Sequence, residues 1–327
     1  MSWQGKKVLV TGAGGFIGSH LAECLCLEGA RVRALVHYNA FGSRGWLDHS
    51  EQSHDMEIIA GDIADADSVR QAVKDIDVIF HLAALIAIPY SYVAPASYVR
   101  TNINGTLNVM QAAREVGIER VVHTSTSEVY GTALQVPISE DHPLQGQSPY
   151  SASKIGADKI AESYFCSFDI PVTTVRPFNT FGPRQSARAV IPTIITQCLS
   201  GRKVKLGSLS PTRDMNFVAN TVAGFMLAAS APEAIGRTIN VGSGREISIN
   251  DLAQMIAKLT GAEIELESDD SRIRPDKSEV ERLLADNQLA KELLGWTPEV
   301  NLEDGLQQTI DWLRENLDKY RPGVYVI

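Results

Sequence analysis

Short apolar runs and amphipathic stretches alternate along the first half of the chain. The apolar run at 8–10 is followed, after a glycine-rich turn, by a stripe of apolar residues at helical spacing between 21 and 27. Later patterns predict a long helix from about 95 to 116 and strands at 31–36, 58–63, 77–84 and from 120 onward. This alternation predicts a doubly wound, parallel α/β sheet with right-handed crossovers. Ligands of such sheets bind beyond the carboxyl ends of the strands.

The pattern becomes mixed after Pro183. A helix is expected from about Ile191 to Leu199, and short strands near 204–206 and 238–241. We therefore predict a smaller C-terminal α/β lobe that closes over the substrate. An amphipathic helix within 287–320 is assigned to the core. The boundaries that follow are 1–178 plus about 213–230 for the larger domain, and about 179–212 plus 231–327 for the substrate lobe.

Composition and charge narrow the classes of function. The chain has 327 residues, with hydrophobic and charged shares of 44% and 21%, which are ordinary for a globular protein. A formal net charge of −9, without a Lys/Arg cluster, argues against nucleic-acid binding. No apolar run reaches the roughly 18 residues of a membrane span. Since the first residues lead directly into a strand, we expect a cytoplasmic protein without a membrane partner.

The four cysteines, at 24, 26, 166 and 198, show neither Cys-x-x-Cys spacing nor a nearby histidine cluster. A disulfide framework and a metal site are therefore not predicted. Core thiols in a reducing compartment are the simpler interpretation.

A glycine motif joins the first predicted strand to the first predicted helix. Its glycines, at 12, 15 and 18, let the backbone approach a pyrophosphate, while the helix N-terminus offers free N–H groups. A tight turn without a ligand is the alternative. The larger domain is thus predicted to be a Rossmann-type dinucleotide-binding domain. We assign its cofactor contacts to Gly12, Gly15, Phe16, Ile17, Gly18, His37, Asp62, Ile63, Leu82, Ala83 and Ala84.

The end of the second predicted strand bears on the choice between NAD and NADP. NAD-binding domains place an acid there to hold the ribose 2′-hydroxyl, but no acid occurs between Glu28 and Asp48. This leaves room for a 2′-phosphate, with His37, Arg33 or Arg44 as partners, and slightly favours NADP. Loop residues that hold a bare ribose are the alternative. Asp62 is interpreted either as an adenine contact or as a turn carboxylate.

Tyr150 and Lys154 are four residues apart in a predicted helix, and so lie on one face of it. The ammonium is expected to favour the phenolate and to lower the tyrosine pKa, which makes Tyr150 a candidate base. Both residues are also predicted to contact the cofactor. The segment from Ser125 to Gly131 follows the fifth strand and therefore opens toward the same crevice.

Four motifs together resemble the extended short-chain dehydrogenase/reductase family that acts on nucleotide sugars. They are Thr-Gly-x-Gly-Gly-Phe-Ile-Gly near the N-terminus, Tyr-x-x-x-Lys, the segment from Arg176 to Pro183, and Arg213-Asp214. The resemblance covers nearly the whole chain. It implies a tightly bound nicotinamide cofactor that is recycled in each turnover, a homodimer, and diphosphate binding by Asn179, Arg213 and Arg274, with Arg184 as a further substrate contact.

Within that family the residues after the fifth strand divide the chemistries, and this chain has Thr126, Ser127 and Glu128 there. The triad resembles that of the nucleotide-sugar 4,6-dehydratases, although dTDP-glucose dehydratases carry Asp in place of Ser127. Our hypothesis is that Tyr150 takes the O4 proton while hydride leaves C4, with Thr126 bonded to O4. Glu128 then removes the C5 proton, water leaves C6, and the hydride returns to C6.

The same triad also resembles that of UDP-glucuronate decarboxylases, so a decarboxylase is our second hypothesis for the function. A 4-epimerase is the third. A decarboxylase needs a cation near the sugar, for which Arg184 or Arg188 is available. The segment from Gly182 to Thr193 resembles the legionaminic-acid-pathway dehydratases, which act on nucleotide-activated N-acetylglucosamine, so a UDP- or GDP-linked N-acetylglucosamine is the preferred substrate. A non-catalytic dinucleotide sensor is disfavoured, because Tyr150, Lys154 and Glu128 occur together.

Overall fold

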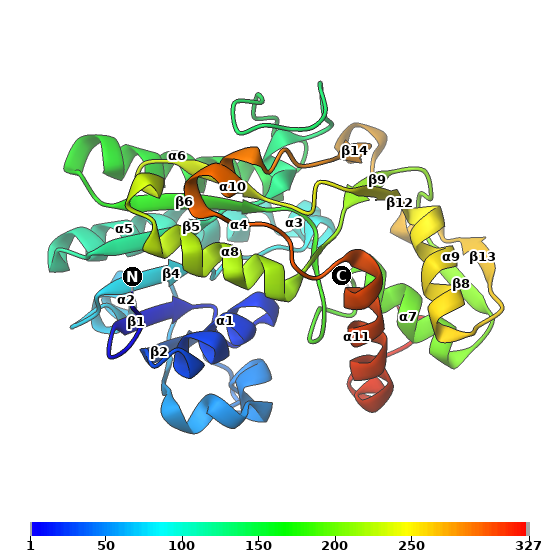
Figure 1. The fold of residues 1–327 in the computed structure, drawn as a ribbon, viewed down its shortest axis with the longest axis horizontal. Helices are drawn as coiled ribbons and strands as arrows, with labels where there is room; N and C mark the ends of the chain where they lie inside the picture. The colour runs from blue at the N-terminus through cyan, green and yellow to red at the C-terminus, as the bar shows by residue number, and fades with distance from the viewer. Residues whose placement is uncertain (1, 325–327) are drawn as a thin grey trace.

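The computed structural model describes residues 2–324. Its centre is a sheet of seven strands, all paired in parallel (Figure 1). In spatial order the strands are β11 (Thr238–Val241), β6 (Val172–Pro177), β5 (Arg120–Thr124), β4 (Val78–His81), β1 (Lys7–Thr11), β2 (Arg31–Val36) and β3 (Glu57–Ala60). The predicted doubly wound fold is confirmed.

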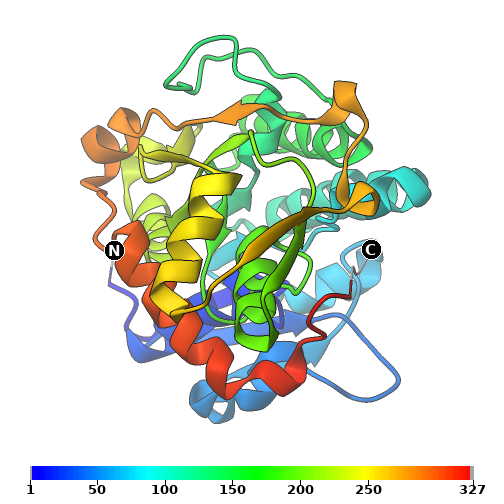
Figure 2. The same ribbon diagram turned by 90° about the vertical axis from the view of Figure 1, so that its right-hand side faces the viewer.

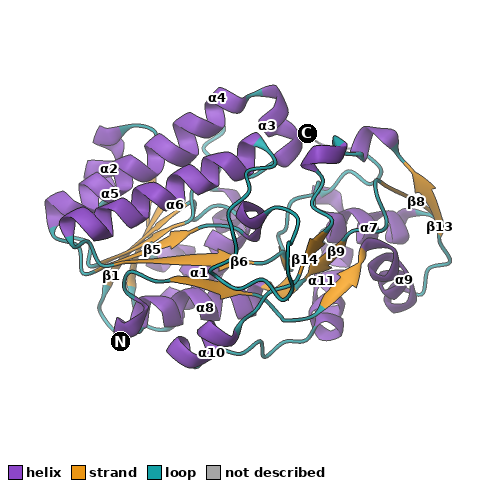
Figure 3. Cartoon of the chain, turned by 90° about the horizontal axis from the view of Figure 1, so that it is seen from above, coloured by secondary structure: helices purple, strands orange, loops and turns teal. Residues whose placement is uncertain are grey.

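Helices cover both faces of this sheet, which Figure 3 shows edge-on. One face carries α2 (Ala66–Ala72), α5 (Gly105–Val116) and α6 (Pro149–Phe168); the other carries α1 (Phe16–Leu27), α8 (Val218–Ser230) and α10 (Gln288–Leu294). Val8 and Val10 of β1 belong to one hydrophobic cluster and Leu9 to another, because alternate side chains of a strand point to opposite faces. Both faces are buried, which explains the unbroken apolar run.

The predicted long helix before β5 is divided into segments. It comprises α4 (Pro95–Tyr98), a π-helical turn (Val99–Asn104) and α5, after the short helix α3 (Ile88–Val93). Asn102 lies in the π-helical turn, where it bonds the backbone of Leu85 in both directions and donates to Ser153 Oγ at 2.9 Å. The turn thus ties the loop after β4 to α6.

Two strands end earlier than the apolar pattern suggested. The N–H groups of Leu82 and Ala83 donate to the Thr11 hydroxyl at 3.1 Å instead of continuing the ladder. After β3, the N–H of Ala64 donates to Asp62 Oδ1 at 2.9 Å. Side chains at the carboxyl ends therefore turn both segments away from the sheet, over the region where a cofactor is expected.

The smaller lobe lies beyond the carboxyl ends of the strands and faces the viewer in Figure 2. It contains the pair β8 (Lys203–Leu206) and β13 (Glu265–Ser268), and the sheet of β9 (Thr212–Asp214), β12 (Glu246–Ser248) and β14 (Arg282–Leu283). Its helices are α7 (Val190–Ser200), α9 (Ile249–Thr260) and α11 (Leu302–Glu315). The pair β7 (Thr180–Phe181) and β10 (Asn216–Phe217) lies between this lobe and the main sheet.

Strand β11 is placed differently from the sequence expectation. Thr238–Val241 was expected in the smaller lobe, but it pairs with β6 at the edge of the main sheet, with Ile239 and Val241 fully buried. A pattern of apolar residues identifies a strand but does not identify its pairing partner. The exact domain boundaries stay a prediction. Within residues 2–324, no helix is long and apolar enough to cross a membrane.

Candidate active site

The glycine turn after β1 fits a dinucleotide pyrophosphate. Gly12 has φ +72°, and a Cβ on it would lie 2.9 Å from backbone atoms of Ala83. A Cβ on Gly18 would lie 2.2 Å from the carbonyl oxygen of Gly12. Helix α1 starts at Phe16 with Gly15 as its N-cap, and no described side chain caps it. Its first N–H groups are therefore available to an anion, as the sequence predicted.

Several other residues assigned to the cofactor surround this turn. Leu82 and Ala83 are held over it through the Thr11 hydroxyl. Asp62 Oδ1 accepts the N–H of Ala64, and the carbonyl of Ile63 accepts a bond from Asn108 at 2.9 Å. The Asp62 carboxylate thus accepts a hydrogen bond within its own turn, which agrees with its interpretation as a turn carboxylate. An adenine contact stays a prediction.

Two of the three cations suggested for a 2′-phosphate are paired elsewhere. Arg33 bonds Glu57 at 2.7 Å and two backbone carbonyls, and Arg44 bonds Asp48 at 2.8 Å. His37 is exposed, and its Nδ1 lies 2.9 Å from the carbonyl oxygen of Tyr38. Neither Arg33 nor Arg44 is therefore free to bind a 2′-phosphate.

Helix α6 carries the pair that the sequence predicts to be catalytic. It begins with a capping box between Ser148 and Ser151, so the first turn that carries Tyr150 is fixed in place. Tyr150 is buried and packs edge-on against Tyr98, with ring centroids 6.3 Å apart. Lys154 is also buried, and its Nζ donates to the carbonyl oxygen of Thr124 at 2.5 Å. The predicted placement on one helix face brings both side chains to the end of β5.

The surroundings of Tyr150 oppose the lowering of its pKa that was expected from Lys154. Burial raises the pKa of Tyr150 above its usual value, a hydrogen bond with Thr126 opposes the rise, and the charges of Glu128 and Asp158 add to it. Burial lowers the pKa of Lys154 to about 8, against the charge of Asp158. The sequence argument counted the charge pair but not the cost of burying both groups.

The segment after β5 carries the other predicted catalytic residues. Thr126 caps the short 3-10 helix Ser127–Tyr130 by accepting the N–H of Glu128 at 3.2 Å, and it also bonds Tyr150. Ser127 is buried, whereas Glu128 lines a cavity. Thr126 therefore links the phenol of α6 to the backbone of the loop that carries Glu128.

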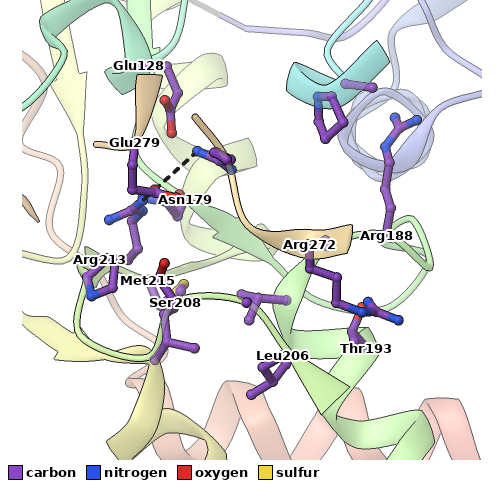
Figure 4. A pocket seen from close by; sticks show the side chains of 18 of the residues that line it. Glu128, Asn179, Arg188, Thr193, Leu206, Ser208, Arg213, Met215, Arg272 and Glu279 are labelled. Atoms are coloured by element: carbon purple, nitrogen blue, oxygen red, sulfur yellow. Dashed lines mark hydrogen bonds and ion pairs between the residues drawn. The ribbon is translucent and has the colours of Figure 1, made fainter. Parts of the chain in front are cut away.

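The cavity has a volume of about 320 Å³ and opens between the main sheet and the smaller lobe (Figure 4). Asn179 follows β6 and lines it, with a buried side-chain nitrogen that has no partner within the described residues. An unpaired buried donor is costly unless a ligand accepts from it. This observation agrees with the anion contact predicted for Asn179.

Arg213 enters the cavity from β9, while its neighbour Asp214 turns away and accepts backbone bonds from Ser243, Gly244 and Ala285. Glu279 lies between two arginines: its Oε1 is 3.1 Å from Arg213 Nη2 and 3.5 Å from Arg274 Nη1. Burial lowers the pKa of Arg213, and the charges of Glu128 and Glu279 oppose that shift. The structure thus gathers both predicted arginines around Glu279, in the cavity that Glu128 also lines.

Arg184 and Arg188 are separated by the fold. Arg184 Nη1 bonds Glu23 Oε2 of α1 at 2.9 Å and is not among the residues that line the cavity. Arg188 does line the cavity, and Figure 4 shows it at some distance from Glu128 and Arg213. It has no hydrogen bond or ion pair among residues 2–324. The substrate contact predicted for Arg184 stays a prediction.

Sequence reasoning missed Glu279 and a buried cluster around Asp158. Asp158 follows Lys154 by four residues, a spacing that placed it on the catalytic face and could have drawn attention to it. Its partners His123, Ser125 and Arg176 come from β5, the residue after it, and β6, and were not predictable from spacing. The part of the chain that the structure describes contains no group of acidic, histidine and cysteine side chains suited to a metal ion.

The geometry can be compared with known proteins. Residues 9–309 match the family described as GDP-mannose 4,6 dehydratase. This chain belongs to the nucleotide-sugar 4,6-dehydratase family of extended short-chain dehydrogenase/reductases. It is therefore an enzyme that uses a nicotinamide cofactor and is built to process nucleotide sugars.

Relatives in this family differ in chemistry. The chain is 36% identical over 314 residues to a UDP-glucose 4-epimerase of Mycolicibacterium smegmatis, covering 94% of this chain and 98% of the relative. It is 32% identical to UDP-glucuronic acid decarboxylase 1 of Xenopus tropicalis, covering 98% and 75%. A dTDP-glucose 4,6-dehydratase from Streptomyces venezuelae, solved with NAD, superposes with a TM-score of 0.88 at 30% identity, covering 96% and 99%.

Proposed function

We propose that this protein is a nucleotide-sugar 4,6-dehydratase that converts a UDP- or GDP-linked N-acetylglucosamine to its 4-keto-6-deoxy derivative. The observation that carries the proposal is the position of Glu128. Its carboxylate faces the cavity on the loop whose Thr126 bonds the catalytic tyrosine. A base in that position can remove the C5 proton after C4 is oxidised, which dehydration requires.

Three side chains serve the first step at C4. Tyr150, as phenolate, takes the O4 proton, and Thr126 donates to O4 from the hydroxyl that the structure places beside the phenol. Lys154 supplies the positive charge that the phenolate needs inside a buried site. When bound, the oxidised nicotinamide supplies the hydride acceptor and a further positive charge. The turn from Gly12 to Gly18 and the N-terminus of α1 would hold its pyrophosphate.

Glu128 serves the second step. Once C4 is a ketone, the C5 hydrogen is acidic, and the carboxylate removes it. The protonated Glu128 returns that proton to the C6 hydroxyl, which leaves as water. Addition of hydride at C6, and at C5 of a proton that balances the one Tyr150 took from O4, leaves the loss of one water as the net change. Ser127, which is buried, is proposed to support the loop and not to act as the C6 acid.

The diphosphate of the substrate is proposed to bind at Asn179, Arg213 and Arg274. Asn179 offers its unpaired amide, and the arginines offer forked donors that suit phosphate oxygens. Glu279 partly neutralises the arginines, so this end of the cavity carries two carboxylates and two guanidinium groups. A neutral hexose with a C6 hydroxyl suits this balance better than a uronate, because Glu128 and Glu279 would repel a third carboxylate.

We propose NAD as the cofactor, although the sequence slightly favoured NADP. Arg33 and Arg44 are paired with Glu57 and Asp48, which leaves His37 as the remaining cation of the three. The similar dehydratase from Streptomyces venezuelae was solved with NAD. Heat release of the bound cofactor followed by mass spectrometry distinguishes the two, since NADP carries one additional phosphate.

The homodimer implied by the family also belongs to this proposal. Helices α5 and α6 lie side by side on one face of the sheet (Figure 3) and expose Leu107 and Phe168 to 39% and 42%. A second copy is proposed to cover these helices. Light scattering coupled to size-exclusion chromatography tests this, and a mass of one chain at micromolar concentration would rule it out.

A UDP-glucuronate decarboxylase is the second candidate, and Arg188 favours it. This arginine lines the cavity without a partner in the described residues, and its charge lowers the pKa of Tyr98, which packs on Tyr150. Burial is the larger influence and raises that pKa. A cation near the catalytic tyrosine is what a uronate carboxylate would need.

Mass spectrometry of reactions with UDP-N-acetylglucosamine, GDP-N-acetylglucosamine and UDP-glucuronate, offered separately, tests the proposal. Loss of one water from an N-acetylglucosamine nucleotide supports the dehydratase and identifies its nucleotide. Loss of carbon dioxide from UDP-glucuronate would establish the decarboxylase instead. A product of unchanged mass but altered chromatographic mobility would indicate a 4-epimerase.

A further inference from the structure

Asp158 is a buried carboxylate on α6, one helical turn beyond Lys154. Three side chains donate to it. Ser125 Oγ donates to Oδ2 at 2.7 Å, His123 Nε2 to Oδ1 at 3.1 Å, and Arg176 donates to Oδ2 through Nη2 at 3.0 Å and Nε at 3.3 Å. Because a carboxylate only accepts hydrogen bonds, His123 carries its proton on Nε2. These donors come from β5, the residue after it, and β6.

The surroundings keep Asp158 ionised. Burial alone would raise its pKa, but the bond from His123 and the charges of Arg176, His123 and Lys154 lower the pKa of Asp158 to about 2. Arg176 is itself buried and is held from the other side, where its Nη1 donates to the Tyr130 hydroxyl at 2.9 Å. Tyr130 in turn donates to Asn240 at 2.8 Å. Asp158 and Arg176 therefore compensate each other's charge, and both are hydrogen-bonded.

The cluster joins the two parts of the catalytic machinery. Tyr150 and Lys154 lie on α6, whereas Thr126 and Glu128 lie on the loop after β5. Ser125 is the residue before Thr126, and its hydroxyl is bound to α6 through Asp158. Its N–H donates to Val175 of β6 at 2.8 Å, so both its backbone and its side chain are fixed. A second tie runs from Lys154 to the carbonyl of Thr124.

We propose that Asp158 is a positioning residue for the reaction. It holds Ser125, and through Ser125 the loop of Thr126 and Glu128, in a fixed position relative to Tyr150. It is also the counter-charge that keeps Lys154 protonated. Asp158 touches neither substrate nor cofactor in this role and acts through Ser125 and Lys154. The activity measurements below depend on the dehydratase proposed above.

The counter-charge role follows from what faces Lys154. Lys154 interacts electrostatically with Asp158 of its own helix, His123 of β5 and His81 of β4, while Arg176 of β6 pairs with Asp158. Burial is the main cause that lowers the pKa values of both histidines, and an imidazole has no negative charge to offer an ammonium. Asp158 is the carboxylate whose charge raises the pKa of Lys154 against burial. Without it the ammonium would lose its proton at a lower pH.

Three variants separate these roles. Ser125→Ala removes the tie but keeps every charge. Asp158→Asn removes the charge and disturbs the tie. Glu162→Gln is the matched control, because Glu162 lies one turn further along α6, exposed and paired with Lys159. We expect Ser125→Ala and Asp158→Asn to lower kcat by about 10-fold or more, with KM for the sugar nucleotide within about 3-fold of wild type. Glu162→Gln should match wild type.

Protonation of Lys154 provides a readout independent of turnover. NMR titration of lysines labelled at the ε carbon, with Lys154 assigned through Lys154→Arg, should show a lower pKa of Lys154 in Asp158→Asn and an unchanged pKa in Ser125→Ala. The alkaline limb of the pH–kcat profile should move in the same direction in Asp158→Asn alone. A simple loss of stability would not move either quantity.

The result that would overturn the inference is wild-type kcat in Ser125→Ala together with an unchanged pKa of Lys154 in Asp158→Asn. Should Asp158→Asn fail to fold, because Arg176 is left without its partner, the kcat of Ser125→Ala decides the positioning role by itself. If wild-type enzyme turns over none of the nucleotide sugars offered, the proposed function has failed. The NMR titration then still decides the counter-charge role.

Discussion

The ammonium of Lys154 donates a 2.5 Å hydrogen bond to the carbonyl oxygen of Thr124, the last residue of β5. This bond fixes the charged end of Lys154 at the point where the strand gives way to the catalytic loop. It also satisfies one hydrogen-bond donor of the buried ammonium. The lysine is thus placed to act on Tyr150 by charge, and this placement leads to the first two predictions.

Lys154→Met should lower kcat by about 10²- to 10⁴-fold, because the phenolate of Tyr150 loses the charge that stabilises it. Stability should not fall, since a buried ammonium is replaced by an apolar side chain of similar length and Asp158 keeps Arg176 as its partner. Turnover assays and thermal unfolding measure the two effects. Lys159→Met, on the exposed side of the same helix, is the control. Equal activity in both variants would contradict the role of Lys154.

Activity should fall as the pH rises through about 8, because burial lowers the pKa of Lys154 to about 8 and the reaction needs it charged. The folded state then binds fewer protons than the unfolded state between pH 8 and the usual lysine range. This group alone therefore makes unfolding less favourable as the pH rises through that window. In Lys154→Arg the charge persists at high pH, so any remaining activity should show no alkaline limb near 8.

Glu128→Gln should stop dehydration, with product formation reduced at least 10²-fold, and leave oxidation at C4 intact. Reduced cofactor should then accumulate on the enzyme after substrate is added, because the hydride has no acceptor at C6. Absorbance of the reduced nicotinamide checks this directly. Failure to see reduced cofactor in the variant, with normal substrate binding, would place Glu128 before C4 oxidation and not after it.

Arg274→Met should raise KM for the nucleotide sugar by about 10- to 100-fold with a smaller change in kcat, because a charge-assisted bond to the diphosphate is worth about 1.5–3 kcal/mol. Arg282→Met is the matched control, since Arg282 pairs with Glu246 and does not line the cavity. Isothermal titration with UDP and with GDP separates binding from catalysis. Equal affinities in the two variants would remove Arg274 from the diphosphate site.

Gly18→Ala should destabilise the fold by about 1–3 kcal/mol and release the cofactor, because its Cβ would lie 2.2 Å from the carbonyl oxygen of Gly12. Gly201→Ala is the control, as a Cβ there meets nothing within 4 Å. Chemical denaturation and the ratio of cofactor to protein after purification measure both effects. A Gly18→Ala protein that keeps wild-type stability and a full complement of cofactor would show that the glycine turn tolerates a side chain.

Features carried by local repetition were predictable from the sequence. The unbroken apolar runs gave the parallel strands, since both faces of the sheet are buried, and the glycines at 12, 15 and 18 gave the strand–turn–helix. Tyr150 and Lys154 share a helix face because of their spacing alone. The cavity-lining carboxylate Glu128 and the unpaired amide of Asn179 agree with the roles that family resemblance assigned to them.

The tertiary structure decided everything that depends on which distant segments meet. It moved Thr238–Val241 into the main sheet, paired Arg184 with Glu23, and left Arg188 facing the cavity. It also placed Glu279 between Arg213 and Arg274, and it surrounded Asp158 with donors from β5 and β6. The periodicity of apolar residues specifies which face of a helix or strand is buried. Which side chains pair with one another, and how much burial shifts their pKa values, depend on how the whole chain folds. The raised pKa of Tyr150 is the chemical consequence, because it is a property of burial and not of spacing.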